Sequence, residues 1–174
     1  ENCAISLYSV AQTQYYNDVL LEQGLLKAIS RLAQHPECFG IAASILYLLS
    51  SDPQHRELVV LDSGARNLLF AIADQPTHSK SAIQFCAQTL FCLSRCAAES
   101  REVLISAGIV PLLLRLSGHD DEKVASPCSE ALRNLSSEGS SAIEEGTVSR
   151  LLAEALSYPR ERKSAAIIDV SPAK

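Results

Sequence analysis

Two stretches of the sequence decide the fold: ISAGIVPLL (residues 105–113) and EALRNLS (residues 130–136). In the first, we expect a short helix to end at Gly108, because glycine enters the left-handed conformation without a Cβ penalty. Pro111 suits the first turn of a second helix, where an N–H has no intrahelical partner. The second stretch lies in a longer helix with an apolar stripe at i, i+3, i+4 and i+7, formed by Cys128, Ala131, Leu132 and Leu135. Three successive helices are predicted.

The same pattern recurs along the chain. A short phrase ends in glycine at Gly24, Gly64, Gly108 and Gly146, with spacings of 40, 44 and 38 residues, and a helical phrase follows each glycine. We expect longer apolar helices at about 2–12, 38–51, 80–96 and 123–137, separated by polar breaks. The stripe of the last helix has counterparts in the other three, at Cys3, Ser6, Leu7, Val10; Ala42, Ile45, Leu46, Leu49; and Cys86, Thr89, Leu90, Leu93.

This period of about 40 residues, together with the two quoted phrases, resembles the armadillo repeat. HEAT repeats fit less well, because they use two helices and lack the glycine break. The resemblance implies an all-α fold, a right-handed α-solenoid (superhelix) of about four repeats with three helices in each.

We expect a single armadillo-repeat domain over residues 1–174. It begins with the third helix of a first repeat (1–12) and continues through repeats at about 17–51, 57–96 and 101–137 to a partial repeat at 140–169. Neither end has the polar surface of a capping repeat, so we expect a fragment of a longer array that continues in both directions.

Composition and charge narrow the function classes. The chain is 47% hydrophobic and 20% charged, a globular balance, and its net charge of −5 without a Lys/Arg cluster argues against nucleic-acid binding. No apolar run reaches the roughly 20 residues that a membrane span needs. The six cysteines are interpreted as structural or unpaired thiols, with a redox or metal role as the alternative. This interpretation favours a cytoplasmic protein, with the nucleus or the cytoskeleton as other locations.

The resemblance places the binding surface on the third helices, which line the concave face of such a superhelix. One register-equivalent column there reads Tyr8, Tyr47, Phe91 and Arg133. Aromatic and Arg side chains are enriched where protein partners bind, so we expect this column to anchor a helical or apolar partner segment. The alternative is that the rings lean inward and cover the edge of the core. The remaining candidates on this face are Gln88, Arg95, Glu130 and Asn134.

A second column reads Ser9, Leu48, Cys92 and Asn134. In armadillo proteins that bind extended peptides, the corresponding column is a ladder of Asn side chains that bond the ligand backbone. Only Asn134 retains the Asn, which argues against extended-peptide recognition along the other units.

No catalytic constellation is apparent. The four histidines, His35, His55, His78 and His119, fall in loops or at helix starts, one per break, and no nucleophile–base pair or phosphate-binding loop is present. The cluster at 119–122 (His-Asp-Asp-Glu) could hold a metal, but acidic residues also favour a helix N-terminus, which we predict here. We therefore predict a non-enzyme without cofactors or metals.

Three functions remain. The first is a protein–protein interaction scaffold that binds its partner in the groove. The alternative is a structural component of a cytoskeletal, axonemal or other lattice, assembled by self-association through uncapped ends. The third, a nuclear-import adaptor, is disfavoured because that class pairs each ladder Asn with a Trp four residues earlier, and the chain contains no Trp.

Overall fold

The computed structural model describes residues 2–13, 15–32, 34–74 and 79–137. All regular secondary structure in these ranges is helical, which confirms the all-α prediction. The expected partial repeat at 140–169 lies outside the described residues. The elements are α1 (Asn2–Ala11), α2 (Asn17–Glu22), α3 (Leu25–Leu32), the 3-10 turn η1 (Pro36–Cys38), α4 (Phe39–Ser51), α5 (Pro53–Leu61), α6 (Ser63–Asp74), α7 (Lys80–Leu93), α8 (Ala98–Ser106), α9 (Ile109–Ser117) and α10 (Glu122–Ser137).

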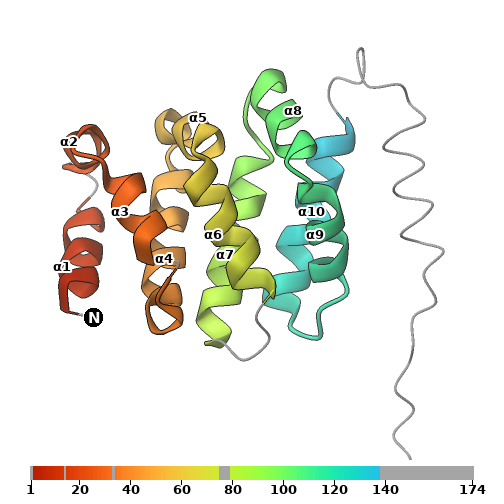
Figure 1. The fold of residues 1–174 in the computed structure, drawn as a ribbon. Coiled ribbons are helices and arrows are strands. Elements are labelled where there is room, and N and C mark those ends of the chain that lie inside the picture. Colours follow the sequence, from red (N-terminus) through yellow and green to blue (C-terminus); the bar gives the residue numbers. More distant parts are fainter. Residues whose placement is uncertain (1, 14, 33, 75–78, 138–174) are drawn as a thin grey trace, which may run out of the picture.

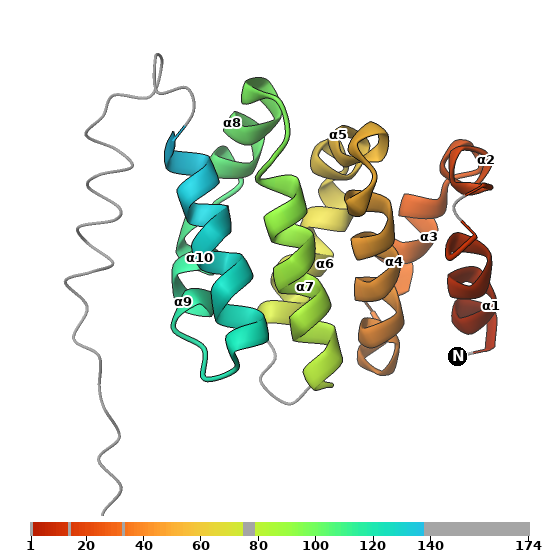
Figure 2. The ribbon, with the colours of Figure 1, turned by 180° about the vertical axis from the view of Figure 1, so that it is seen from behind.

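The helices follow one another in a repeating order (Figure 1). Each unit has a first helix (α2, α5, α8), a second helix (α3, α6, α9) and a long third helix (α4, α7, α10), and α1 lies in line with the third helices. Seen from behind, α1, α4, α7 and α10 form one layer, with the second helices in another layer beyond it and the first helices at one end (Figure 2). Every unit therefore packs against the next one.

The core is a continuous aliphatic cluster between these layers. The predicted stripes of α4 and α7 are fully buried, with exposures between 0 and 2%. In α10, Cys128 and Ala131 are buried, while Leu132 and Leu135 are half-buried. The second helices contribute large aliphatic side chains to the same cluster, among them Ile29, Leu68, Leu69, Ile72, Leu112, Leu113 and Leu116.

Among the described side chains of α1, the predicted stripe is not fully buried. Ser6 is exposed, and Val10 is 40% exposed. A first and a second helix precede each of α4, α7 and α10, whereas no described helix precedes α1 to cover this side. The buried residues of α1 are instead Ala4 and Ala11, on its face toward α4.

The glycine break is confirmed at two positions. Gly24 and Gly108 have φ angles of +85° and +84°, in the left-handed region, and separate α2 from α3 and α8 from α9. Pro111 lies in the first turn of α9, as expected. The third helix predicted to reach residue 96 ends earlier, at Leu93. Beyond it the backbone N–H groups of Arg95 and Cys96 donate to carbonyls three residues back, a tightened final turn.

The prediction is wrong at Gly64, which lies in the first turn of α6 instead of ending α5. The break there is made by Asp62, whose carboxylate accepts a hydrogen bond of 2.7 Å from the backbone N–H of Ala65. A Cβ at position 64 would overlap the Ser30 hydroxyl and lie 2.7 Å from the Ser30 Cβ. Glycine is required here because α6 approaches α3 closely, and not for a positive φ.

We expect Gly64→Ala to lower the free energy of unfolding by about 1–3 kcal/mol, because the added methyl group overlaps Ser30. Ser30→Gly removes the obstruction, so it should recover part of that loss when the two changes are combined. Urea unfolding of the double-mutant cycle measures this coupling. Gly40→Ala is the matched control, because a Cβ there would meet only the Ser81 hydroxyl at 3.8 Å. Strictly additive effects of the two substitutions would show that the close approach does not explain Gly64.

Candidate functional site

One face of α1, α4 and α7 carries a similar trio of side chains at i, i+4 and i+7, with a small residue on either side of an aromatic ring. We call it the seam trio. Residues at this spacing lie on one side of a helix, so the three side chains face the neighbouring helix together. The small residues are buried, with exposures of 4% or less, and the rings are half-buried. The trios are Ala4, Tyr8, Ala11 in α1; Ala43, Tyr47, Ser50 in α4; and Ala87, Phe91, Ser94 in and directly after α7.

Contacts across the seams show where these faces point. The ring of Tyr47 packs against Phe85 of α7, with centroids 5.8 Å apart and planes inclined by 33°. At the next seam, the side-chain amide of Asn134 in α10 donates to Ser94 Oγ over 3.0 Å. The ring of Tyr47 therefore fills the seam between α4 and α7, while the rings of Tyr8 and Phe91 pack against the core, and all three are only half-buried. A half-buried ring can cover the edge of the core with one part of its surface and contact a partner with the other. The two alternatives given for this column therefore do not exclude each other.

The outward surface of α7 lies between two aromatic rings. Gln88 is three residues from Phe85 on one side and three from Phe91 on the other, so it lies midway between the two seams. The guanidinium of Arg95 stands 5.8 Å from the centroid of the Phe91 ring, within cation–π distance. Gln88 is half-buried and Arg95 is exposed.

The structure brings the candidate residues together on one layer of helices. Glu130 and Arg133 are exposed on α10, beside the surface of α7. In α10, Arg133 lies where a seam trio would have its aromatic ring. The two residues at the flanking positions, Ser129 and Ser136, are exposed. We call the outward surface of α4, α7 and α10 the third-helix face (Figure 2).

Asn134 has a structural role within the fold. Its side-chain amide bonds Ser94 across the seam, and its backbone carbonyl accepts a 3.4 Å hydrogen bond from Arg101 of α8. Ser94 Oγ in turn donates to the carbonyl of Phe91 over 2.7 Å. The ladder position thus joins α10 to α7, a structural role that the sequence did not indicate.

The preceding seam lacks this bond. Cys92 occupies the ladder position in α7, and Ser50 occupies the position of Ser94 in α4. Burial raises the pKa of the Cys92 thiol, while Arg56 and a hydrogen bond with Ser51 act in the opposite direction. The Ser50 hydroxyl is buried and has no hydrogen-bond partner among the described residues.

Asp121 forms a polar link between α7 and α10 that sequence reasoning missed. It accepts hydrogen bonds from Gln84 at 2.9 Å and from the backbone N–H of Lys123 at 3.1 Å, and Lys80 lies 3.1 Å away. These partners lower the pKa of the Asp121 carboxyl to about 2, and the hydrogen bond from Gln84 makes the largest contribution. The carboxylate is therefore charged at all but strongly acidic pH. Asp121 directly precedes α10, so the predicted helix start is confirmed.

Buried His55 was also missed. Its Nε2 lies 2.7 Å from the carboxylate of Asp18, which ties α5 to α2 of the neighbouring unit, while its Nδ1 lies 3.6 Å from Asp52. The histidine side chain is only 6% exposed. The sequence placed His55 at a helix start, but nothing in its spacing pointed to a partner 37 residues away.

The described cysteine side chains are free thiols in the core. Cys38, Cys86, Cys92, Cys96 and Cys128 are all buried and unpaired by disulfides. Burial raises the pKa of Cys128 to about 12 and that of Cys96 to about 11, and it also raises that of Cys86. With their pKa values raised in this way, the thiols of Cys86, Cys96 and Cys128 are protonated at neutral pH and lack the thiolate character of reactive cysteines.

Two other kinds of site are absent from the part of the chain that the structure describes. No group of three or more His, Cys, Asp and Glu side chains within these ranges is arranged to hold a metal ion. None of the described helices combines the length and apolar character needed to cross a membrane.

Comparison with known families identifies the repeat. The model of the armadillo/beta-catenin-like repeat matches residues 98–137. These residues are α8, α9 and α10, one complete three-helix unit with the left-handed Gly108 between its first two helices. The chain contains an armadillo repeat. No curated protein matches it closely enough to count as a relative.

Cys92→Asn should extend the ladder from this armadillo repeat to the preceding seam. Asn is close to Cys in size, and its amide can donate to the Ser50 hydroxyl as Asn134 donates to Ser94. We expect the free energy of unfolding to rise by about 0.5–1.5 kcal/mol in chemical denaturation. In a Ser50→Ala background the gain should disappear. A gain of the same size in that background would mean that the new amide bonds elsewhere.

Proposed function

We propose that this armadillo-repeat protein is a non-catalytic scaffold that holds a protein partner along its third-helix face. The match to an armadillo repeat supports protein binding in general, because such repeats act as interaction modules. Stacked repeats also present extended surfaces, to which each unit contributes a similar strip of side chains. We further propose that α2–α4 and α5–α7 are two more armadillo repeats, and that α1 is the third helix of another.

The observation that carries the proposal is the arrangement around Gln88. Phe85 and Phe91 border this residue, Arg95 covers one of the two rings, and Tyr47 extends the aromatic surface to α4. Partly exposed rings beside Arg are typical of the anchoring positions of protein interfaces. The charged residues Glu130 and Arg133 continue the face on α10. We infer that the partner presents an apolar or helical segment, with polar groups along its edges.

The test uses exposed charges, because Tyr47 and Phe91 also fill the seams and their removal would weaken the fold. In Arg95→Glu/Glu130→Lys the two charges on the face are reversed while the net charge is unchanged. Lys27→Glu/Glu102→Lys is the control, because it makes the same two charge reversals on exposed residues of α3 and α8.

We expect immobilised wild-type and control chains to retain the same specific partner from a lysate, quantified by mass spectrometry. The face variant should retain at least about five-fold less of it, since charges at an interface rim set partner choice. Circular dichroism checks that all three chains have the same helix content. Equal retention by the face variant would place the binding surface elsewhere and contradict the proposal.

A further inference from the structure

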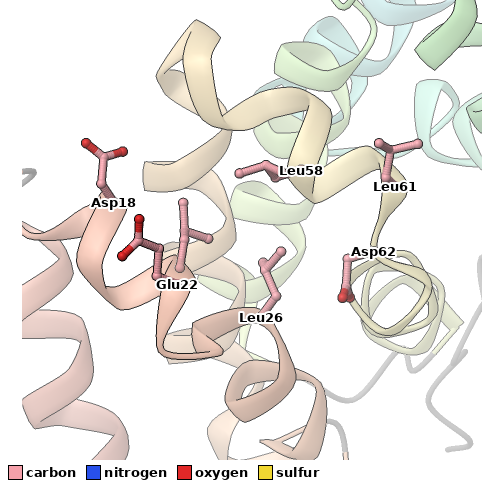
Figure 3. A pocket seen from close by; sticks show the side chains of 7 residues that line it. Asp18, Glu22, Leu26, Leu58, Leu61 and Asp62 are labelled. Atoms are coloured by element: carbon pink, nitrogen blue, oxygen red, sulfur yellow. The ribbon is translucent and has the colours of Figure 1, made fainter.

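A second surface lies between the first and second helices of two neighbouring units (Figure 3). It is a cleft of about 730 Å³, within the size range of protein ligand pockets. Leu21 and Leu26 come from the α2–α3 unit, and Leu58 and Leu61 come from α5. Three carboxylates complete the lining: Asp18, Glu22 and Asp62.

The cleft exists because α2 is short. It has six residues, whereas α5 and α8 have nine each, so it covers less of its neighbour. α2 is tied to α5 by the bond between Asp18 and His55, but the two helices otherwise make little contact. Leu58 and Leu61 consequently remain 48% and 60% exposed on α5.

All the charged residues that line the cleft are acidic. No Lys, Arg or His lines the cleft beside its three carboxylates. Asp18 and Asp62 already have structural partners, in His55 and in the backbone of α6. Glu22 is exposed and takes part in no hydrogen bond or ion pair within the described residues, which leaves its charge available.

We propose that this cleft docks a helical peptide segment of a protein partner, with leucine-like side chains on one face and Lys or Arg residues beside them. The four leucines offer an apolar floor that gains free energy when a partner's apolar side chains cover it. The carboxylates at the border select basic flanking residues and disfavour acidic ones. This surface is separate from the third-helix face, so the scaffold has room for two partners at once.

The test uses a short fluorescein-labelled helical peptide with leucines at i, i+3 and i+7 and lysines on both flanks. One control peptide has Glu in place of each Lys, and another has Ser in place of each Leu. Fluorescence anisotropy with the whole chain should give at least ten-fold tighter binding of the first peptide than of either control. Equal binding of the lysine and glutamate peptides would overturn the proposal, and so would no binding of the lysine peptide.

Variants of the protein locate the site. Leu58→Ala/Leu61→Ala should weaken binding at least ten-fold, and Glu22→Gln should weaken it two- to five-fold, with the difference shrinking in high salt. Glu102→Gln on α8 and Arg95→Glu/Glu130→Lys on the third-helix face should leave binding unchanged. The substituted leucines are already exposed, so circular dichroism should show an intact fold.

Two further results would overturn the proposal. Peptide-induced shifts in the 15N NMR spectrum should fall on α2, α3, α5 and α6, and shifts confined to α4, α7 and α10 would contradict it. Sedimentation equilibrium should show a monomer. A dimer that Leu58→Ala/Leu61→Ala dissociates would make a second copy of the chain the occupant instead of a basic peptide.

Discussion

The packing of α4 against α7 is the contact on which the rest of the structure depends. These two third helices make the most extensive contact of any described pair, and both of their apolar stripes are fully buried. Small side chains make the close approach feasible, since Ala43 and Ser50 face α7 and are completely buried. Tyr47 lies between them and fills the outer part of the seam against Phe85. A single seam thus combines the aliphatic core with the aromatic edge of the proposed binding face.

Because this seam is repeated, the chain can form the third-helix face with only a few aromatic residues. Each unit adds a strip to the third-helix face, and its position is set by the seam trio of the helix before it. Two directional bonds join α7 and α10 at their seam: Asn134 donates to Ser94 Oγ, and the Gln84 amide donates to the carboxylate of Asp121. The ring edges, Gln88 and Arg95 are left at the surface, supported by buried small residues beneath. Because these side chains are already held in place, they lose little conformational entropy when a partner binds.

The sequence predicted the fold well because its signals were local. The glycines at 24 and 108, the Pro111 helix start and the apolar stripes of α4, α7 and α10 follow from spacing alone. Gly64 was misread because the same residue type serves close packing against Ser30, a contact between helices that no local pattern reveals. The α1 stripe failed for a related reason, since burial depends on what lies beside a helix as well as on its own period.

The candidate site was less predictable. Register placed Tyr8, Tyr47 and Phe91 in one column, but whether a ring faces solvent or a neighbouring helix depends on the distance between third helices. The acidic cleft at Leu58 and Leu61 gave no sequence signal, because it arises from the difference in length between α2 and α5.

Native-state hydrogen exchange tests the central claim, that the α4–α7 seam is the most stable part of the stack. Amides of α4 and α7 should exchange last and only through global unfolding, as shown by a denaturant dependence equal to that of the whole chain. Amides of α1 and α2, which have fewer neighbours, should exchange earlier through local opening. Exchange of α7 at the rate of α2, or independent opening of each unit, would contradict the account.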